Sequence, residues 1–267
     1  MKNRRCAAPL SDEWLGYMPV RTSLARSRLA RPMYSSLGRD DVHVWFAFLD
    51  CMIPQLGSLL EILAADEIAK ARRFRFEKDR QEYVLSRGLL RRILSCYTGI
   101  PSGQLRFRYN SCGKPALTSE SGGEQLAFNL SHAHGACLCA VTTGKKVGVD
   151  LEYMREDVDY AQLAGRLFSP REASVLGLLP SDLRQKAFFI CWTRKEAYIK
   201  ARGEGLSLDL QSFDVVAARD EPTKPLQIES DSREACCWSL VDLDTAPGYC
   251  AALAIEGRAC EVKLRRW

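Results

Sequence analysis

The stretch Lys146–Tyr153, with the sequence KVGVDLEY, alternates apolar and polar residues in the manner of a β-strand. Successive strand side chains point to opposite faces, so its valines and its leucine are expected to face the core, while Asp150 and Glu152 share the other face. Two adjacent carboxylates repel each other unless a cation lies between them, and carboxylate oxygens suit Mg²⁺. Taken alone, the pattern is equally well explained by an exposed strand end with two solvated acids.

A second informative stretch lies on the long helix predicted over residues 181–201 and reads WTRKEAYIK near its end. Trp192, Glu196 and Ile199 are spaced four and three residues apart, so Glu196 falls within the apolar stripe of the helix. A carboxylate in that position must be paired or bound to a metal, because burying a bare charge is costly. Lys200 follows one turn later, and an ordinary Glu–Lys helix pair is the alternative interpretation.

Around these two stretches, the pattern predicts an α+β protein made of two similar halves, residues 41–144 and residues 145–267, with the boundary near Gly144. Residues 1–40 are rich in arginine and lack a sustained apolar period, so we expect a partly ordered basic arm. The expected strands lie near 42–48, 105–109, 126–130, 136–142, 146–153, 213–216, 238–241 and 249–255. The expected helices cover 79–97, a segment that begins with the capping box Ser169-Pro170-Arg171-Glu172, and 181–201.

The composition excludes several classes of protein. An apolar content of 46% without a run of about eighteen apolar residues argues against a membrane span. The net charge of +5 suits an acidic partner or a phosphorylated ligand but is too small to indicate nucleic-acid binding. Eleven scattered cysteines, no Cys-x-x-Cys pair and three histidines argue against zinc, and the odd count without a visible signal peptide predicts free thiols in the cytoplasm.

Polar residues also occur at strand ends and turns, where ligands are often bound. Ser131 and His132 follow an apolar strand, and Lys114 is presented by the turn Cys112–Pro115. A lone histidine is also often structural. A basic helix surface comprises Lys70, Arg72, Arg73, Arg80, Arg87, Arg91 and Arg92. Most of these cations are expected to be solvated, while one or two could face a phosphate.

Together these residues resemble the signature of the 4′-phosphopantetheinyl transferases of the Sfp type. The two stretches Gly148–Glu152 and Trp192–Lys200 carry the resemblance, although the serine common after the signature tryptophan is Thr193 here. Accessory motifs occur in the family's order: Arg72-Arg73-Phe74, Gly113-Lys114-Pro115, Phe128-Asn129-Leu130-Ser131-His132, Phe168-Ser169-Pro170-x-Glu172 and Gly203-x-Gly205. The resemblance covers about residues 42–255.

The resemblance implies a monomer of two pseudo-two-fold halves, with coenzyme A bound in the cleft between them. Such an enzyme transfers the 4′-phosphopantetheine arm of coenzyme A to a serine of an acyl or peptidyl carrier protein and releases adenosine 3′,5′-bisphosphate. Fatty-acid and secondary-metabolite carriers are both compatible with it, and a broad-range enzyme of secondary metabolism is favoured. No nucleic acid or membrane partner is implied.

The resemblance also assigns roles to particular residues. The expected ligands of Mg²⁺, or of Mn²⁺, are Asp150, Glu152 and Glu196. The expected contacts to coenzyme A are Lys70, Lys114, Ser131 and His132, to which charge and position add Arg73 and Arg87. Lys200 is expected beside the α-phosphate and would stabilise or protonate the leaving phosphate. Glu196 is the favoured base for the serine proton, with Glu152 as the rival.

Two other functions are compatible with parts of the sequence. Another Mg²⁺-dependent enzyme acting on phosphoesters or nucleotides would need only the carboxylates. A non-catalytic binding protein on the same scaffold would present the basic arm to an acidic partner.

Overall fold

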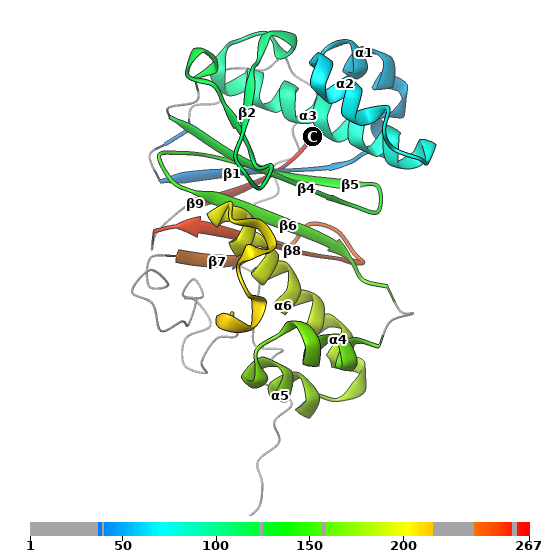
Figure 1. The fold of residues 1–267 in the computed structure, drawn as a ribbon, viewed down its shortest axis with the longest axis vertical. Coiled ribbons are helices and arrows are strands. Elements are labelled where there is room, and N and C mark those ends of the chain that lie inside the picture. Colours follow the sequence, from blue (N-terminus) through cyan, green and yellow to red (C-terminus); the bar gives the residue numbers. More distant parts are fainter. Residues whose placement is uncertain (1–36, 39, 123–124, 156–158, 216–237, 258–260) are drawn as a thin grey trace, which may run out of the picture.

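The computed structural model describes residues 37–38, 40–122, 125–155, 159–215, 238–257 and 261–267. It confirms the α+β class and arranges the chain in layers of helix, sheet, sheet and helix (Figure 1). Each half contributes most or all of one of the two packed sheets and one 22-residue helix, which is α3 (Glu77–Thr98) in the first half and α6 (Ser181–Arg202) in the second. This repetition agrees with the expected two-half plan.

The first sheet has the strand order β4-β5-β1-β9. Strands β4 and β5 form an antiparallel hairpin that turns at His134-Gly135, and β5 also pairs antiparallel with β1. Strand β9 lies parallel to β1 at the edge. The bounds are Asp41–Phe48 for β1, Leu126–Ala133 for β4, Ala136–Thr143 for β5 and Glu261–Arg266 for β9.

The second sheet is antiparallel, with the order β6-β8-β7. The bounds are Val147–Tyr153 for β6, Trp238–Asp242 for β7 and Tyr249–Glu256 for β8. The two sheets pack against each other through a shared apolar core, to which β6 contributes Val147, Val149 and Leu151. The predicted orientation of these three side chains is therefore confirmed.

The outer faces of both sheets are covered by helices. Helix α1 (Leu56–Glu61) buries Leu59, and α3 buries its leucines and Ile93, against the first sheet. Helices α4 (Tyr160–Leu167), α5 (Pro170–Leu178) and α6 share the core beneath the second sheet. The remaining elements of the first half are helix α2 (Ala65–Ala71) and the hairpin of β2 (Phe107–Tyr109) and β3 (Pro115–Leu117).

The strands of the second half differ from the expected ones at two places. Strand β9 was not expected, and it joins the sheet of the first half, so the last strand of residues 145–267 crosses back. Within residues 213–215, the strand expected at 213–216 is reduced to a single β-bridge residue, Asp214, and Val216 lies outside the described residues. Instead, the carbonyl oxygen of Phe213 accepts a hydrogen bond from Lys195. The basic arm expected over residues 1–40 lies almost entirely outside the described residues.

Buried His43 makes the stability of this fold sensitive to acid. Its side chain on β1 is 1% exposed, and its Nδ1 lies 2.8 Å from the hydroxyl of Tyr97. Burial, followed by the charge of Arg265, lowers the pKa of His43 from 6.5 to about 4. Between these values the unfolded chain binds a proton that the folded chain does not, so the free energy of unfolding falls as the pH drops through this window. The expected loss is about 3 kcal/mol.

Urea unfolding measured from pH 7 to pH 4 would check this prediction. The His43→Gln variant keeps a polar side chain but cannot titrate, so its free energy of unfolding should fall less steeply with acid than that of the unsubstituted protein. Carboxylates act equally on both proteins, so they cancel in the comparison. Parallel curves would contradict the prediction.

Candidate active site

Helix α6 lies directly on the face of β6 that carries Asp150 and Glu152. The contact is closest at Gly148, where a methyl group would lie 2.1 Å from the carbonyl oxygen of Ala197 and 2.3 Å from the amide nitrogen of Ala201. Only glycine permits this approach. Asp150 is therefore covered by the helix and is 2% exposed, which excludes the alternative of a solvated strand end for this residue.

Asp150, Lys200 and Ser131 form one polar cluster where β4, β6 and α6 meet. Lys200 Nζ lies 2.5 Å from Asp150 Oδ1 and 3.0 Å from Ser131 Oγ. Ser131 Oγ also donates to Asp150 Oδ1 over 3.1 Å. Strand β4 is held beside β6 here, because the N–H of Val149 donates to Asn129 Oδ1 over 2.9 Å.

The second carboxylate oxygen of this cluster, Asp150 Oδ2, is buried and has no hydrogen-bond partner among the described residues. Buried carboxylate oxygens are normally paired, because an unpaired one has lost its hydration without compensation. Asp150 Oδ2 is therefore a ready acceptor for a cation or a donor that binds to the protein.

Glu152 and Glu196 add two further carboxylates to this region. Glu152 Oε1 accepts a hydrogen bond from the indole N–H of Trp192 over 3.2 Å. Burial raises the pKa of Glu152, and the charge of Asp150 raises it further. Burial and then Asp150 likewise raise the pKa of Glu196, while Lys200 lowers it. The negative charge of Asp150 thus disfavours the charged forms of Glu152 and Glu196 more than Lys200 offsets it, and a bound cation would relieve this repulsion.

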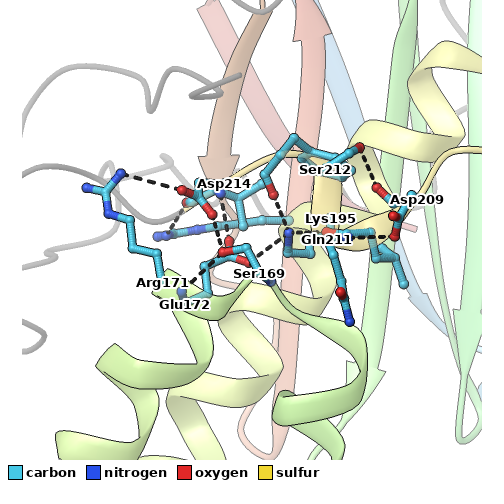
Figure 2. A network of polar contacts seen from close by, with 12 residues as sticks. Ser169, Arg171, Glu172, Lys195, Asp209, Gln211, Ser212 and Asp214 are labelled. Atoms are coloured by element: carbon cyan, nitrogen blue, oxygen red, sulfur yellow. Dashed lines mark hydrogen bonds and ion pairs between the residues drawn. The ribbon is translucent and has the colours of Figure 1, made fainter. Parts of the chain in front are cut away.

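A buried ion pair beside the site fixes the rotation of α6 (Figure 2). Lys195 Nζ lies 2.8 Å from Glu172 Oε2, and both side chains are fully buried. The same ammonium donates to the carbonyl oxygens of Leu210 and Phe213 over 2.6 and 2.5 Å. Glu172 closes the predicted capping box with Ser169 at the start of α5. The pair therefore ties α5, α6 and the segment after α6 together, which decides which side chains α6 turns toward β6.

His132 and Lys70 lie on the first-half side of this cluster. His132 follows Ser131 on β4 and is open to solvent. Partial burial lowers the pKa of the His132 ring, Glu82 raises it, and the ammonium groups of Lys200 and Lys70 lower it further. Lys70 also lies 5.5 Å from the ring centre of Tyr83. His132 and Lys70, both expected from the resemblance to contact coenzyme A, are thus close enough for the ammonium group of Lys70 to act on the ring.

Arg87, an expected contact to coenzyme A, is paired within the protein. Its side chain is buried, and its Nε and Nη2 donate to Glu67 Oε1 over 2.9 and 2.6 Å. Arg91 donates to the other oxygen of Glu67 over 2.6 Å. Glu67 belongs to α2, so Arg87 and Arg91 anchor α2 on α3 and thereby hold Lys70. Arg73 is exposed in the turn after α2, and its role stays a prediction.

Lys114, an expected contact to coenzyme A, already has two backbone partners within the protein. Its Nζ donates to the backbone carbonyl oxygens of Val147 and Ala201 over 3.0 and 2.9 Å. Burial lowers the pKa of Lys114 to about 8, and Lys146 adds to this shift. The amine is still mostly charged at pH 7, so it can donate both hydrogen bonds.

Comparison with known proteins gives this site its context. Residues 146–254 match the 4′-phosphopantetheinyl transferase superfamily, and residues 52–144 match the 4′-phosphopantetheinyl transferase N-terminal family. The chain is 40% identical over 234 residues to the 4′-phosphopantetheinyl transferase HetI of Nostoc sp., an alignment that covers 88% of this chain and 95% of HetI. The chain belongs to the 4′-phosphopantetheinyl transferase family.

Two other phosphopantetheinyl transferases extend the comparison. The putative 4′-phosphopantetheinyl transferase slr0495 of Synechocystis sp. is 32% identical over 187 residues, covering 70% of this chain and 74% of the relative. The 4′-phosphopantetheinyl transferase Sfp of Bacillus subtilis is 30% identical over 198 residues, covering 72% and 84%. The chain is thus an enzyme of the phosphopantetheinyl transferase type.

In this phosphopantetheinyl transferase the carboxylates of Asp150, Glu152 and Glu196 do not converge on one position. Within the described ranges, no group of three His, Cys, Asp or Glu side chains is placed to hold a metal ion. Lys200 instead lies against Asp150 Oδ1. The donor chemistry nevertheless fits a divalent cation, because Asp150 Oδ2, unpaired among the described residues, and the carboxylates of Glu152 and Glu196 are oxygen ligands of the kind that Mg²⁺ binds. None of the described helices is long and apolar enough to span a membrane.

Sequence reasoning missed several supporting contacts of this phosphopantetheinyl transferase. The bond from Trp192 to Glu152 and the bond from Val149 to Asn129 join residues 40 and 20 positions apart. The Lys195–Glu172 pair was indicated only by the capping box at Glu172, since a lysine in a helix is usually exposed. Such contacts need the fold before they can be assigned.

Proposed function

We propose that this chain transfers the 4′-phosphopantetheine arm of coenzyme A to a serine of an apo-carrier protein, with Mg²⁺ as cofactor and adenosine 3′,5′-bisphosphate as the second product. The observation that carries the proposal is the buried Asp150 Oδ2, which has no partner in the described part of the chain, while Oδ1 of the same carboxylate bonds to Lys200 and Ser131. Membership of the transferase family and the names of the relatives support the same reaction.

The proposed metal ligands are Asp150, Glu152 and Glu196. When bound, Mg²⁺ would neutralise negative charge on the pyrophosphate of coenzyme A. The ammonium group of Lys200, in the second half, contacts Asp150 and also Ser131 of the first half. From there it would move from Asp150 to the leaving phosphate and stabilise its negative charge. The 3′-phosphate would lie near His132 and Lys70, where two ammonium groups already act on the imidazole ring.

Glu196 is the proposed general base for the carrier serine. Its pKa is raised by burial and by Asp150, which makes the carboxylate a better proton acceptor than an ordinary surface acid. Glu152 is the rival, but its Oε1 already accepts a hydrogen bond from Trp192, which stabilises the charged form and weakens it as a base.

A carrier panel tests this function directly. The protein is incubated with coenzyme A, Mg²⁺ and apo-carriers of fatty-acid, polyketide and peptide synthesis, and each carrier is weighed by mass spectrometry. We expect at least one carrier to gain the mass of the phosphopantetheine arm, and we expect chelation by EDTA to prevent the gain. A panel without any mass gain would refute the proposal, and tight binding of coenzyme A by calorimetry would exclude a general phosphoesterase.

A further inference from the structure

Two glycine-containing motifs from opposite halves of the chain meet in the structure. The turn Asn110–Lys114 joins β2 to β3, and the segment Ala201–Gly205 ends helix α6. Asn110 Nδ2 donates to the carbonyl oxygen of Gly203 over 2.7 Å, and Cys112 Sγ donates to that of Glu204 over 3.1 Å. We call these two segments together the latch.

Lys114 of the latch forms hydrogen bonds with two elements of the second half. One ammonium group donates to the carbonyl oxygen of Ala201, in the last turn of α6, and to that of Val147, the first residue of β6. The last carbonyls of a helix have no partner within the helix and carry its negative end, so a lysine is well suited to them. A single side chain of the first half thus holds both elements that carry the proposed metal ligands.

Each side of the latch is also fixed by its own local structure. Asn110 Oδ1 accepts hydrogen bonds from the amides of Cys112 and Lys114 over 3.0 and 2.8 Å, which fixes the turn. Gly203 ends α6 with φ +74°, and a methyl group there would lie 3.1 Å from Asn110 Nδ2 and 3.2 Å from Lys114 Cδ. The two surfaces therefore fit closely only with glycine at this position.

We infer that the latch positions Lys200, and that Asn110 and Lys114 are positioning residues which act on the reaction through α6. Lys200 directly precedes Ala201, whose carbonyl oxygen is held by Lys114. Releasing that carbonyl loosens the last turn of α6, and with it the ammonium that must lie beside Ser131 and Asp150. Only the expected change in kcat rests on the proposed function; the expected change in hydrogen exchange does not.

The test compares Lys114→Met and Asn110→Ala with the control Lys146→Met, which removes an exposed ammonium close to Lys114. We expect both latch variants to lower kcat for carrier modification by roughly ten- to a hundredfold, because small misplacements of a catalytic group are costly. The Kd for coenzyme A should stay within about twofold, and the control should match the unsubstituted protein. Lys114→Arg, which retains several N–H donors, should recover most of kcat.

Hydrogen exchange supplies a readout that does not depend on activity. The amides of residues 199–203 should exchange faster in both latch variants than in the control, because the last turn of α6 opens more often. The inference is overturned if Lys114→Met raises the Kd for coenzyme A tenfold or more while exchange at 199–203 is unchanged, since Lys114 would then act by direct contact. Faster exchange in a protein that modifies no carrier would support the latch and refute the proposed function.

Discussion

The Glu196→Gln variant is expected to lose nearly all transferase activity while gaining thermal stability. Glutamine keeps the size of the side chain but can neither accept the serine proton nor bring a negative charge to the cation. Removal of a general base lowers rates by roughly 10²- to 10⁴-fold. Carrier modification measured by mass spectrometry under saturating coenzyme A gives the rate.

The gain in stability follows from the sign of the pKa shift. Glu196 has a pKa raised above its ordinary 4.5 by burial and by Asp150, so its charged form destabilises the folded state at neutral pH. Glutamine removes that repulsion, and the melting temperature should rise at pH 7. Near pH 4 the carboxyl group is largely protonated in the folded protein, so the difference should shrink.

Glu61→Gln is a matched control for this experiment, because Glu61 is exposed at the end of α1. It removes the same charge and should leave both rate and melting temperature unchanged. Full activity of Glu196→Gln would exclude Glu196 as the base and as a required ligand. A lower melting temperature at pH 7 would contradict the electrostatic account of the site.

The Gly148→Ala variant is expected to destabilise the protein by at least about 3 kcal/mol, at the upper end of what overpacking costs. The added methyl would lie 2.1 Å from the carbonyl oxygen of Ala197 and 2.3 Å from the amide nitrogen of Ala201. Both are backbone atoms, so no side chain can rotate away, and α6 must move as a body. Such a movement separates Glu196 and Lys200 from Asp150, and transfer should be lost as well.

Gly165→Ala makes a fitting comparison, because Gly165 lies in α4 and a methyl there meets nothing within 4 Å. Alanine favours a helix over glycine by roughly 0.5–1 kcal/mol, so this variant should be slightly more stable. Urea unfolding of the two variants should therefore shift in opposite directions. Equal shifts would show that the packing of α6 on β6 is looser than the structure indicates.

Local patterns were sufficient to predict much of the fold. The alternation in β6 and the capping box at Ser169 place their elements correctly, because the signals lie within a few neighbouring residues. Strand β9 was not predicted. Its partner is β1, more than two hundred residues earlier, and four of its six side chains are charged, so neither the register nor the pairing can be read locally.

In the candidate site, too, local sequence predicted some residues correctly and could not reveal contacts that depend on the fold. Asp150, Glu152, Glu196 and Lys200 were selected by motif, and the structure places them on two facing elements. Arg87 was selected by charge and position, which do not reveal its buried partner twenty residues away, and its contact with coenzyme A stays a prediction. The expectation that Lys114 contacts coenzyme A stays untested, since its ammonium already bonds to two carbonyl oxygens whose positions depend on the contact between the halves.

The crossing of β9 back to β1 has a consequence for biosynthesis. Strands β1, β4 and β5 leave the ribosome long before β9, so the first sheet must persist for a time with the outer edge of β1 uncovered. An uncovered edge recruits other strands readily. The growing chain is therefore most vulnerable to mispairing between the synthesis of β5 and that of β9, and chaperone dependence should be concentrated in that interval.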